Sequence, residues 1–307
     1  MTLQQLRYLC AIVDESFSIT RAAAKLHTSQ PGISKQLKLL EIELGTKLIQ
    51  RKKNRTVDLS AHGYAILPLA RRTLKVADTI KQIIRDVDEP TKGKIVIATT
   101  HVHARYSLLS TMISFRALYP RVQVHFRLGS SQEIAYWVST GEADLAIGAA
   151  TTRGLPGLAT LPCLRLRQCI ITPAQHPLLK LKCPSLEAIT RHPIISTGME
   201  SRITILITER CASFGLKPNI AMHALDLETV KKYVELGFGI AIVPTVAIDL
   251  KRERGIRVID ASHIFEPAIA SIITHDEMPS RQYISDFVDL VAPRYRGKRI
   301  IQDLPKS

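Results

Sequence analysis

The sequence predicts an N-terminal all-α unit, a long linker helix, and a C-terminal α/β unit of two lobes. In three stretches of the first ninety residues, 2–13, 29–45 and 65–87, apolar side chains recur every three or four positions, which is the period of an amphipathic helix. Beyond residue 93, short β-branched runs alternate with helical stretches, as in sheets covered by helices. Between the two patterns lies Asp88–Gly93, whose Pro, Gly and charged residues are typical of a linker.

Composition limits the class of protein. The chain has 307 residues, 46% hydrophobic and 22% charged, which suits two or three folded domains and excludes wholesale disorder. No apolar run is long enough for a transmembrane helix, and Asp14–Glu15 interrupts the stretch where a signal peptide needs its apolar core. We therefore expect a cytoplasmic protein with no membrane partner and reduced cysteines. The Cys163–Cys169 spacing is not that of a zinc site, so no metal is expected.

Two short helices are predicted at the start of the chain. Apolar residues at helical spacing mark the first over Thr2–Val13. Ser18 is the expected N-cap of the second, Ile19–Leu26, whose Ala22–Ala24 run lets another helix approach closely. The next three residues, His27–Ser29, leave room only for a tight turn.

The third helix is expected to begin at the N-cap Ser29 and to end at Gly45. An apolar stripe should pack inward; its members are Ile33, Leu37, Leu40 and Leu44. The opposite face is polar and basic, which makes the pair of helices a helix-turn-helix. The second helix of that motif enters the major groove of double-stranded DNA. The expected DNA contacts on this helix are Ser29, Gln30, Pro31, Ser34, Lys35 and Lys38, with Gln30, Ser34 and Lys35 at base edges and Lys38 at a phosphate.

A cationic hairpin is predicted after the third helix. Lys47–Gln50 and Thr56–Leu59 are expected to form two short strands around Arg51–Arg55, and residues 47–55 contain no acid. Such a hairpin is typical of the wing of a winged helix, whose cations neutralise phosphates and release counterions. The expected phosphate contacts are Arg51, Lys52 and Arg55. The same residues are also compatible with a small helical domain that carries a solvated basic loop.

A long helix over Ala65–Val87 is predicted to link the two units. An isolated helix is marginal in water, so its apolar side needs a partner, and a second copy of the chain is the expected one. Packing on the N-terminal unit alone is the alternative. The expected domains are residues 1–63 for DNA binding, 64–90 for the linker and dimerisation helix, and 91–307 for the α/β unit. Within the α/β unit, lobe I is expected at about 91–162 and 267–307, and lobe II at about 163–266.

The α/β unit is predicted from strands that alternate with helices. The expected strands are Lys94–Ala98, Val122–Phe126, Leu145–Gly148 and Gly239–Val243, and the expected helices are Tyr106–Leu118, Ser131–Thr140 and Leu227–Leu236. This order predicts parallel sheets, in which ligands bind beyond the carboxyl ends of strands. Those ends carry Thr99–His103 and Gly129–Ser131, whose hydroxyls and backbone N–H groups suit a small anion. The alternative for each Ser or Thr is that it only caps a helix.

The chain resembles the LysR-type transcriptional regulators. The resemblance is carried by Thr28–Leu37 (TSQPGISKQL), by the residues Leu39, Glu41, Leu44 and Gly45 that follow, and by Leu59–Gly63 (LSAHG). Other segments resemble the CysB-like subgroup: Ala98–His101 (ATTH) with Ala104–Tyr106 (ARY), Gly141–Asp144 (GEAD), Leu161–Cys163 (LPC), Val230–Val234 (VKKYV) and Leu236–Gly239 (LGFG).

The resemblance implies an effector-responsive activator that is not an enzyme and needs no cofactor. The two lobes would resemble a periplasmic binding protein. The subgroup regulates sulfur assimilation and cysteine biosynthesis, responds to acetylserine and to sulfate or thiosulfate, and forms homodimers or homotetramers that act on RNA polymerase. The alternative within the family is a regulator of an unrelated pathway with a different effector.

The predicted effector site departs from the subgroup pattern. Val102 and His103 stand where the subgroup has Thr and Gln, Ala149–Ala150 stand for Thr-Glu, and Glu200–Arg202 replaces Thr-Gly-Arg. Each lost hydrogen-bond donor at a buried anion costs about 1–3 kcal/mol of binding free energy, so we expect an effector other than bare sulfate. We expect this effector to be anionic or sulfur-linked. Arg202 and a neutral-to-cationic His103 are expected to attract it. The expected effector contacts are Thr99, Thr100, Val102, His103, Ser131, Ser201 and Arg202.

Two other classes of protein are compatible with α/β lobes. An enzyme could use His101, His103 or His125, but the sequence has no Gly-x-Ser-x-Gly, no His-Glu-x-x-His and no phosphate-binding glycine loop. A secreted solute-binding protein would need a signal peptide and would not need a helix-turn-helix.

Overall fold

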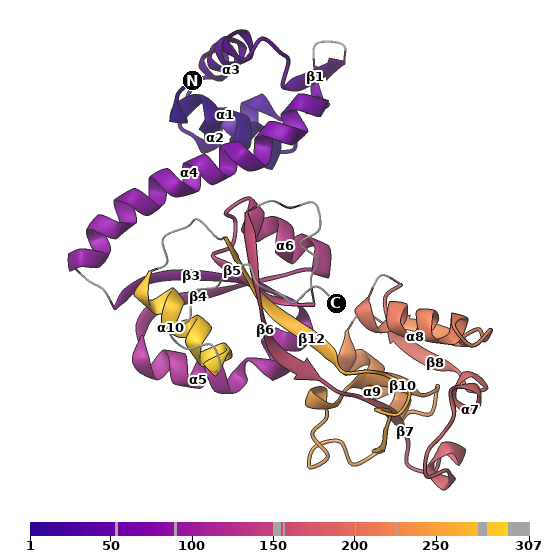
Figure 1. The fold of residues 1–307 in the computed structure, drawn as a ribbon. Helices are drawn as coiled ribbons and strands as arrows, with labels where there is room; N and C mark the ends of the chain where they lie inside the picture. The colour runs from indigo at the N-terminus through magenta and orange to yellow at the C-terminus, as the bar shows by residue number, and fades with distance from the viewer. Residues whose placement is uncertain are drawn as a thin grey trace.

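The computed structural model describes residues 1–52, 55–88, 91–149, 155, 157–199, 201–224, 226–275 and 281–293, and the side chains of 51, 52, 55–57 and 81–88 lie outside that description. Figure 1 shows the N-terminal unit, the long helix α4 that leaves it, and the two-lobed C-terminal unit. The predicted fold class is confirmed.

The described part of the N-terminal unit contains four helices and a hairpin. Their bounds are α1 Leu3–Asp14, α2 Ile19–Lys25, α3 Gln30–Glu43, β1 Ile49–Lys52, β2 Arg55–Leu59 and α4 Ala61–Asp88. Both predicted caps are present, since the hydroxyl of Ser18 accepts from the Arg21 amide and that of Ser29 from the Gly32 amide. Gly45 ends α3 with φ +66°, a left-handed conformation that a residue without Cβ adopts readily.

Three sequence predictions for this unit need correction. Leu44 is 37% exposed and does not complete the apolar stripe of α3, because the helix ends at Glu43 and Leu44 is only its C-cap. The strands reach Lys52 and resume at Arg55, so the wing cations at 51, 52 and 55 belong to strands and not to the tip. Helix α4 begins at Ala61 instead of Ala65, because Ser60 Oγ accepts from the Gly63 amide and caps the helix earlier.

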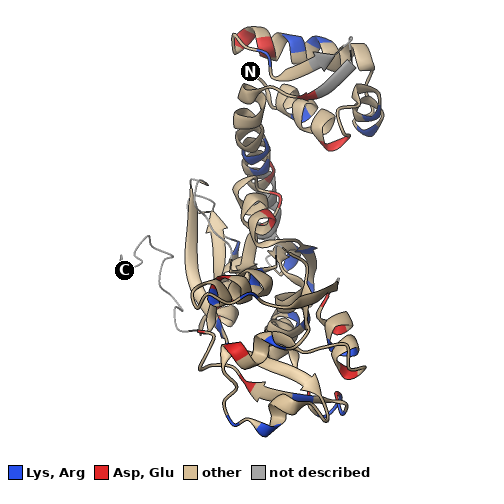
Figure 2. Cartoon of the chain, turned by 90° about the vertical axis from the view of Figure 1, so that its right-hand side faces the viewer, with Lys and Arg blue, Asp and Glu red and all other residues tan. Residues whose placement is uncertain are grey.

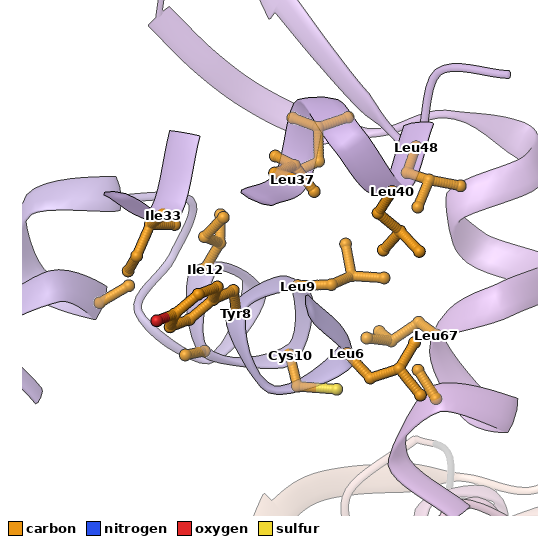
Figure 3. Close-up of a cluster of buried hydrophobic side chains, with 14 of the residues drawn as sticks. Leu6, Tyr8, Leu9, Cys10, Ile12, Ile33, Leu37, Leu40, Leu48 and Leu67 are labelled. Carbon is orange, nitrogen blue, oxygen red and sulfur yellow. The ribbon is translucent and has the colours of Figure 1, made fainter. Parts of the chain in front are cut away.

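One apolar cluster holds the N-terminal unit together. Figure 3 shows Leu6, Leu9 and Ile12 of α1 directed toward side chains of α3 and α4. The buried partners are Ile33, Leu37 and Leu40 of α3, Leu67 of α4, and Leu48 just before β1. Because the inner stripe of α3 is fixed in this core, its opposite face is held toward the outside.

Lobe I is a five-stranded sheet in the order β4-β3-β5-β12-β6. The strands are β3 Lys92–Thr99, β4 Arg121–Leu128, β5 Leu145–Gly148, β6 Leu158–Leu166 and β12 Ala268–His275. Helices α5 (Leu109–Leu118) and α10 (Gln282–Val291) cover one face, where Phe115 and Phe287 pack on Ile95 and Ile97. Helix α6 (Ser131–Ser139) covers the other face.

Lobe II is built on a three-stranded sheet, β10-β7-β11, beside the parallel pair β8-β9. Its strands are β7 Gln168–Pro173, β8 Ile194–Thr197, β9 Ile220–Ala224, β10 Ala241–Pro244 and β11 Ile256–Asp260, and its helices are α7 Leu186–Thr190, α8 Arg202–Ala212 and α9 Leu227–Glu235. Short 3₁₀ turns occupy Pro177–Lys180 and Thr245–Ala247. Helices α8 and α9 lie in different apolar clusters around this sheet.

The prediction of wholly parallel sheets is wrong. β3 pairs in parallel with β4 and β5, but β12 runs antiparallel to β5 and β6, and β7 runs antiparallel to β10 and β11. The chain leaves lobe I through β6 and returns through β12, so these two strands run in opposite directions. A π-helix over His103–Ser107 also precedes α5, where the sequence predicted one continuous helix from Tyr106.

None of the helices in the described ranges is long and apolar enough to cross a membrane.

Candidate DNA-binding and effector sites

The outward face of α3 carries the side chains predicted to contact DNA. Gln30, Pro31, Lys35 and Lys38 are exposed, and Ser34 is half-buried. In the described part of the chain, the side chains of Gln30, Lys35 and Lys38 make no hydrogen bond or ion pair, so they are available to a ligand. Ser29 is exposed but its hydroxyl is occupied as the N-cap. Figure 2 shows Lys and Arg spread over the whole molecule, including this unit.

A tight turn orients α3 against α2. The Thr28 amide donates to the Ala23 carbonyl at 2.9 Å, and His27 adopts φ +51°. That left-handed residue redirects the chain within three positions, as the sequence predicted. The turn therefore fixes the direction in which the N-terminus of α3 leaves α2.

Glu41 joins α3 to the hairpin, a role that the sequence reasoning missed. Its side chain is 6% exposed, and one carboxylate oxygen accepts from the amides of Leu48 at 2.9 Å and Ile49 at 3.3 Å. The other oxygen pairs with Lys47 at 3.2 Å. A carboxylate in line with the apolar stripe of α3 is the signal that could have revealed it. The contact fixes where the wing begins relative to α3.

For the wing cations Arg51, Lys52 and Arg55, the structure describes the backbone positions only. Lys52 pairs with Arg55 across the hairpin, and Arg51 pairs with Thr56 after a register shift. The side chains of Arg51, Lys52 and Arg55 lie outside the described residues, so their phosphate contacts stay predictions.

At the predicted effector site, the carboxyl ends of β3 and β5 meet. A Cβ added at Gly148 would lie 3.8 Å from Thr100 Cγ2 and 3.9 Å from His103 Cδ2, so these three residues are neighbours. The Thr99 hydroxyl instead donates to the Ile147 carbonyl at 2.7 Å and is fully buried. Val102 packs on the apolar cluster of lobe II. Of the two threonines at the end of β3, Thr100 is thus the one whose hydroxyl has no partner in the described structure.

His103 is buried and neutral, which corrects the expectation of a partly cationic ring. Burial lowers the pKa of His103 to about 4, and its Nδ1 lies 3.2 Å from Ser107 Oγ. An uncharged imidazole adds no net attraction for an anion at neutral pH.

The pH dependence of stability tests this assignment. The unfolded chain protonates His103 below about pH 6.5 while the folded chain does not, so folding stability should fall between that pH and about 4. At pH 5 this contribution is about 2 kcal/mol. The free energy of unfolding would be measured in urea at pH 7 and at pH 5. Between these two pH values it should fall less for His103→Gln than for the wild type, by a corresponding amount. His101→Gln, at an exposed neighbour, should keep the wild-type drop; equal drops in all three proteins would contradict a buried neutral His103.

The N-terminus of α6 is already occupied by a carboxylate. Ser130, and not Ser131, is the N-cap; its hydroxyl accepts from the Glu133 amide, and Glu133 accepts from the Ser130 amide at 2.8 Å. The amide and side-chain hydrogen bonds from Ser130 lower the pKa of Glu133. This capping box, readable as Ser-x-x-Glu, was missed in the sequence. It places a negative charge beside Ser131.

Ser201 and Arg202 lie at the start of α8 in lobe II. Ser201 caps the helix, and its hydroxyl lies 2.8 Å from Thr204 Oγ1, which itself lies 2.5 Å from Ser196 Oγ. Arg202 is exposed. No hydrogen bond or ion pair among the described residues joins this pair to Thr99, Thr100, Val102, His103 or Ser131.

A charged contact ties the segment after His103 to lobe II. The Tyr106 hydroxyl donates to Glu228, and Arg105 lies 3.6 Å from the same carboxylate. Lys231, also paired with Glu228, lies 5.3 Å from the centroid of the Tyr106 ring. The residues that follow the strand end of lobe I are therefore anchored on α9.

Two family models match the chain. Residues 3–64 match the bacterial regulatory helix-turn-helix protein of the lysR family, and residues 88–296 match the LysR substrate binding domain. Among curated relatives, the transcriptional regulator CysB of Burkholderia cenocepacia is 33% identical over 304 residues, covering 99% of this chain and 97% of that protein. The regulator SsuR of the same organism is 33% identical over 98% of this chain and 97% of its own length.

A solved structure supports the fold over almost the whole chain. A full-length OxyR variant from Pseudomonas aeruginosa superposes with a TM-score of 0.71, covering 95% of this chain and 97% of that one at 21% identity.

Proposed function

The chain belongs to the LysR family of DNA-binding transcription regulators, and from that premise we propose that it activates genes of sulfur metabolism in response to a small effector. DNA binding and effector binding follow from the family, whose members are regulators and not enzymes. The sulfur assignment is supported by the CysB-like segments of the sequence and by the similarity to CysB and SsuR along nearly the full length.

We propose that α3 reads sequence while the wing supplies affinity. Gln30, Ser34 and Lys35 lie in the first turns of α3, the part of a recognition helix that reaches base edges. Lys38, one turn further, suits a phosphate. The observation that supports this proposal is the contrast between the two sides of α3: the polar side chains of one side are exposed and unpaired, whereas the apolar side chains of the other side are buried in the core.

Base preference in a selection from random duplexes tests this assignment. Gln30→Ala should flatten the preference at one position of each half-site, since a bidentate base contact discriminates by about 1–3 kcal/mol. Lys38→Ala should weaken binding to all duplexes alike and leave the preference profile unchanged. Uniform loss with Gln30→Ala would contradict a base-reading role.

We propose that the effector is a sulfur-linked anion larger than sulfate, held near Thr100 and the start of α8. Three features disfavour bare sulfate: the buried Thr99 hydroxyl, the uncharged His103 and the carboxylate of Glu133. Arg202 is exposed at the N-terminus of α8, where its charge and the helix dipole both attract anions.

Thermal unfolding of the full chain tests the effector class. Sulfate, thiosulfate, acetylserine and small alkanesulfonates would be compared; we expect an upward shift with at least one sulfonate that exceeds the shift with sulfate. Arg202→Ala should remove that shift, whereas Arg191→Ala, at an exposed arginine of the same lobe, should keep it. No shift with any compound would overturn the sulfur proposal and leave a regulator of another pathway, the alternative within the family.

We further propose a homodimer or homotetramer that contacts RNA polymerase. The exposed apolar side chains Leu69, Val76 and Ile80 of α4 support the self-association, and the subgroup resemblance implies the contact with RNA polymerase.

A further inference from the structure

Arg71 of α4 connects the N-terminal unit to lobe I. Its guanidinium contacts Asp14 at the end of α1, at 2.5 Å, and also pairs with Glu142 in the loop before β5. Arg127 of β4 holds Glu142 from the other side at 2.6 Å. The side chains of Arg71 and Glu142 are each 17% exposed, so the pair is largely shielded from solvent.

A second ion pair lies one helical turn further along α4. Lys75 contacts Asp144 at 2.9 Å, and Arg281 contacts the same carboxylate oxygen at 2.8 Å. The second oxygen of Asp144 accepts from the Val96 amide of β3 at 2.7 Å. A Cβ added at Gly141 would come within 2.9 Å of Lys75 Cβ, so the helix and the loop touch closely. We call the contact of Arg71 and Lys75 with residues 141–144 the ionic joint.

The joint uses one of three distinct faces of α4. Leu67, Ala70 and Leu74 pack into the core of the N-terminal unit. Arg71 and Lys75, spaced by four, pair with carboxylates of lobe I. A third face remains exposed; it carries Leu69, Thr73, Val76 and Ile80. The joint therefore competes neither with the core nor with the face available to a second copy.

Charge, and not apolar packing, holds the two parts together. None of the apolar clusters among the described residues contains side chains from both the N-terminal unit and lobe I. Arg71 Nε is buried without an acceptor in the described structure, so the joint is incompletely satisfied. The free energy of the closed contact is only slightly lower than that of the separated, hydrated groups, because the cost of desolvation offsets much of the ionic attraction.

A single short strand connects the joint to the predicted effector site. β5 runs from Leu145, next to Asp144, to Gly148, next to Thr100 and His103, and all four of its residues are buried. Asp144 also binds the amide of Val96 in β3, whose carboxyl end is Thr99. A displacement of these strands at the effector end therefore moves the acidic ends of the joint.

We propose that the ionic joint is a detachable lock between the DNA-binding unit and its own effector domain. Closed, it fixes the direction of α4 and so of α3 relative to lobe I. Ligand-induced movement of β5 opens it and frees the DNA-binding unit to change orientation. The proposal rests on family membership and not on the sulfur assignment.

Distances between two spin labels on the full chain test the lock. The labels would be placed at Ala24→Cys on α2 and Gln132→Cys on α6, both exposed, in a Cys183→Ser background. Dilution with excess unlabelled chain restricts the signal to one labelled protomer in each oligomer. The joint is opened in two independent ways: Glu142→Gln removes charge, and Gly141→Asn inserts a side chain against Lys75. Asparagine tolerates the φ of +72° at position 141. Glu187→Gln removes an exposed carboxylate of lobe II as the matched control.

The wild type and Glu187→Gln should show one narrow distance distribution. Glu142→Gln and Gly141→Asn should each add a longer and broader population, with the circular dichroism of a folded chain. A wild-type distribution in Glu142→Gln would overturn the proposal, as would a wild-type distribution in the folded Gly141→Asn protein.

Discussion

Replacing Leu69 and Ile80 together by glutamate is expected to convert the protein to a monomer and to weaken its binding to a two-half-site duplex by about 100-fold or more. Leu69 and Ile80 are each 59% exposed and Val76 is 40% exposed. With Thr73 they follow the 4-3-4 spacing of a coiled-coil seam. A helix of 28 residues whose third face is apolar and exposed has a clear surface for an identical helix.

The loss of DNA affinity follows from geometry. A dimer places two α3 helices on one duplex, so the second contact is intramolecular once the first has formed. Sedimentation velocity measures the oligomeric state, and fluorescence anisotropy measures the affinity for the duplex. Leu250→Glu, at a leucine 61% exposed in lobe II, is the matched control and should change neither. A dimeric Leu69→Glu/Ile80→Glu protein would exclude α4 as the principal interface.

Glu41→Leu is expected to destabilise the DNA-binding unit by about 2–4 kcal/mol, because it leaves the buried amides of Leu48 and Ile49 without an acceptor. Glu41→Gln keeps a carbonyl oxygen at the same place and should cost much less. The ion pair with Lys47 adds little in either case, since the Lys47 side chain is 74% exposed.

Hydrogen exchange of the α1 and α3 amides measures this effect within the full chain. Protection should fall strongly with Glu41→Leu and only slightly with Glu41→Gln. Glu43→Leu, at an exposed carboxylate two residues away, should leave protection near that of the wild type. Equal protection in Glu41→Leu and Glu43→Leu would show that Glu41 does not anchor the hairpin.

The helix-turn-helix could be predicted because its signals are local. The caps Ser18 and Ser29, the glycine at 45 and the apolar stripe Ile33–Leu40 each depend on a few neighbouring residues. Glu41 was missed because its partners lie seven and eight residues away, at the entry to β1, whose position depends on the folded core. Leu44 was misplaced because the helix ends before the stripe is complete.

The α/β unit was predicted in class but not in topology. β12 completes the lobe I sheet more than a hundred residues after β5, and no local pattern encodes that pairing. At the effector site, the alternation Ile95, Ile97, Thr99 could have indicated that Thr99 lies on the same face of the sheet as the two buried isoleucines. The ionic joint could not be predicted, because it depends on how α4 crosses lobe I.

The salt dependence of DNA binding by the wild-type protein tests the central claim most directly. A duplex selected from a random library would be compared with a scrambled duplex between 50 and 200 mM salt. For a dimer with about 6–10 phosphate contacts, affinity for both duplexes should fall by about 10³–10⁵, with the selected duplex bound more tightly at every concentration. Binding that is independent of salt, or equal for the two duplexes throughout, would contradict a sequence-reading regulator.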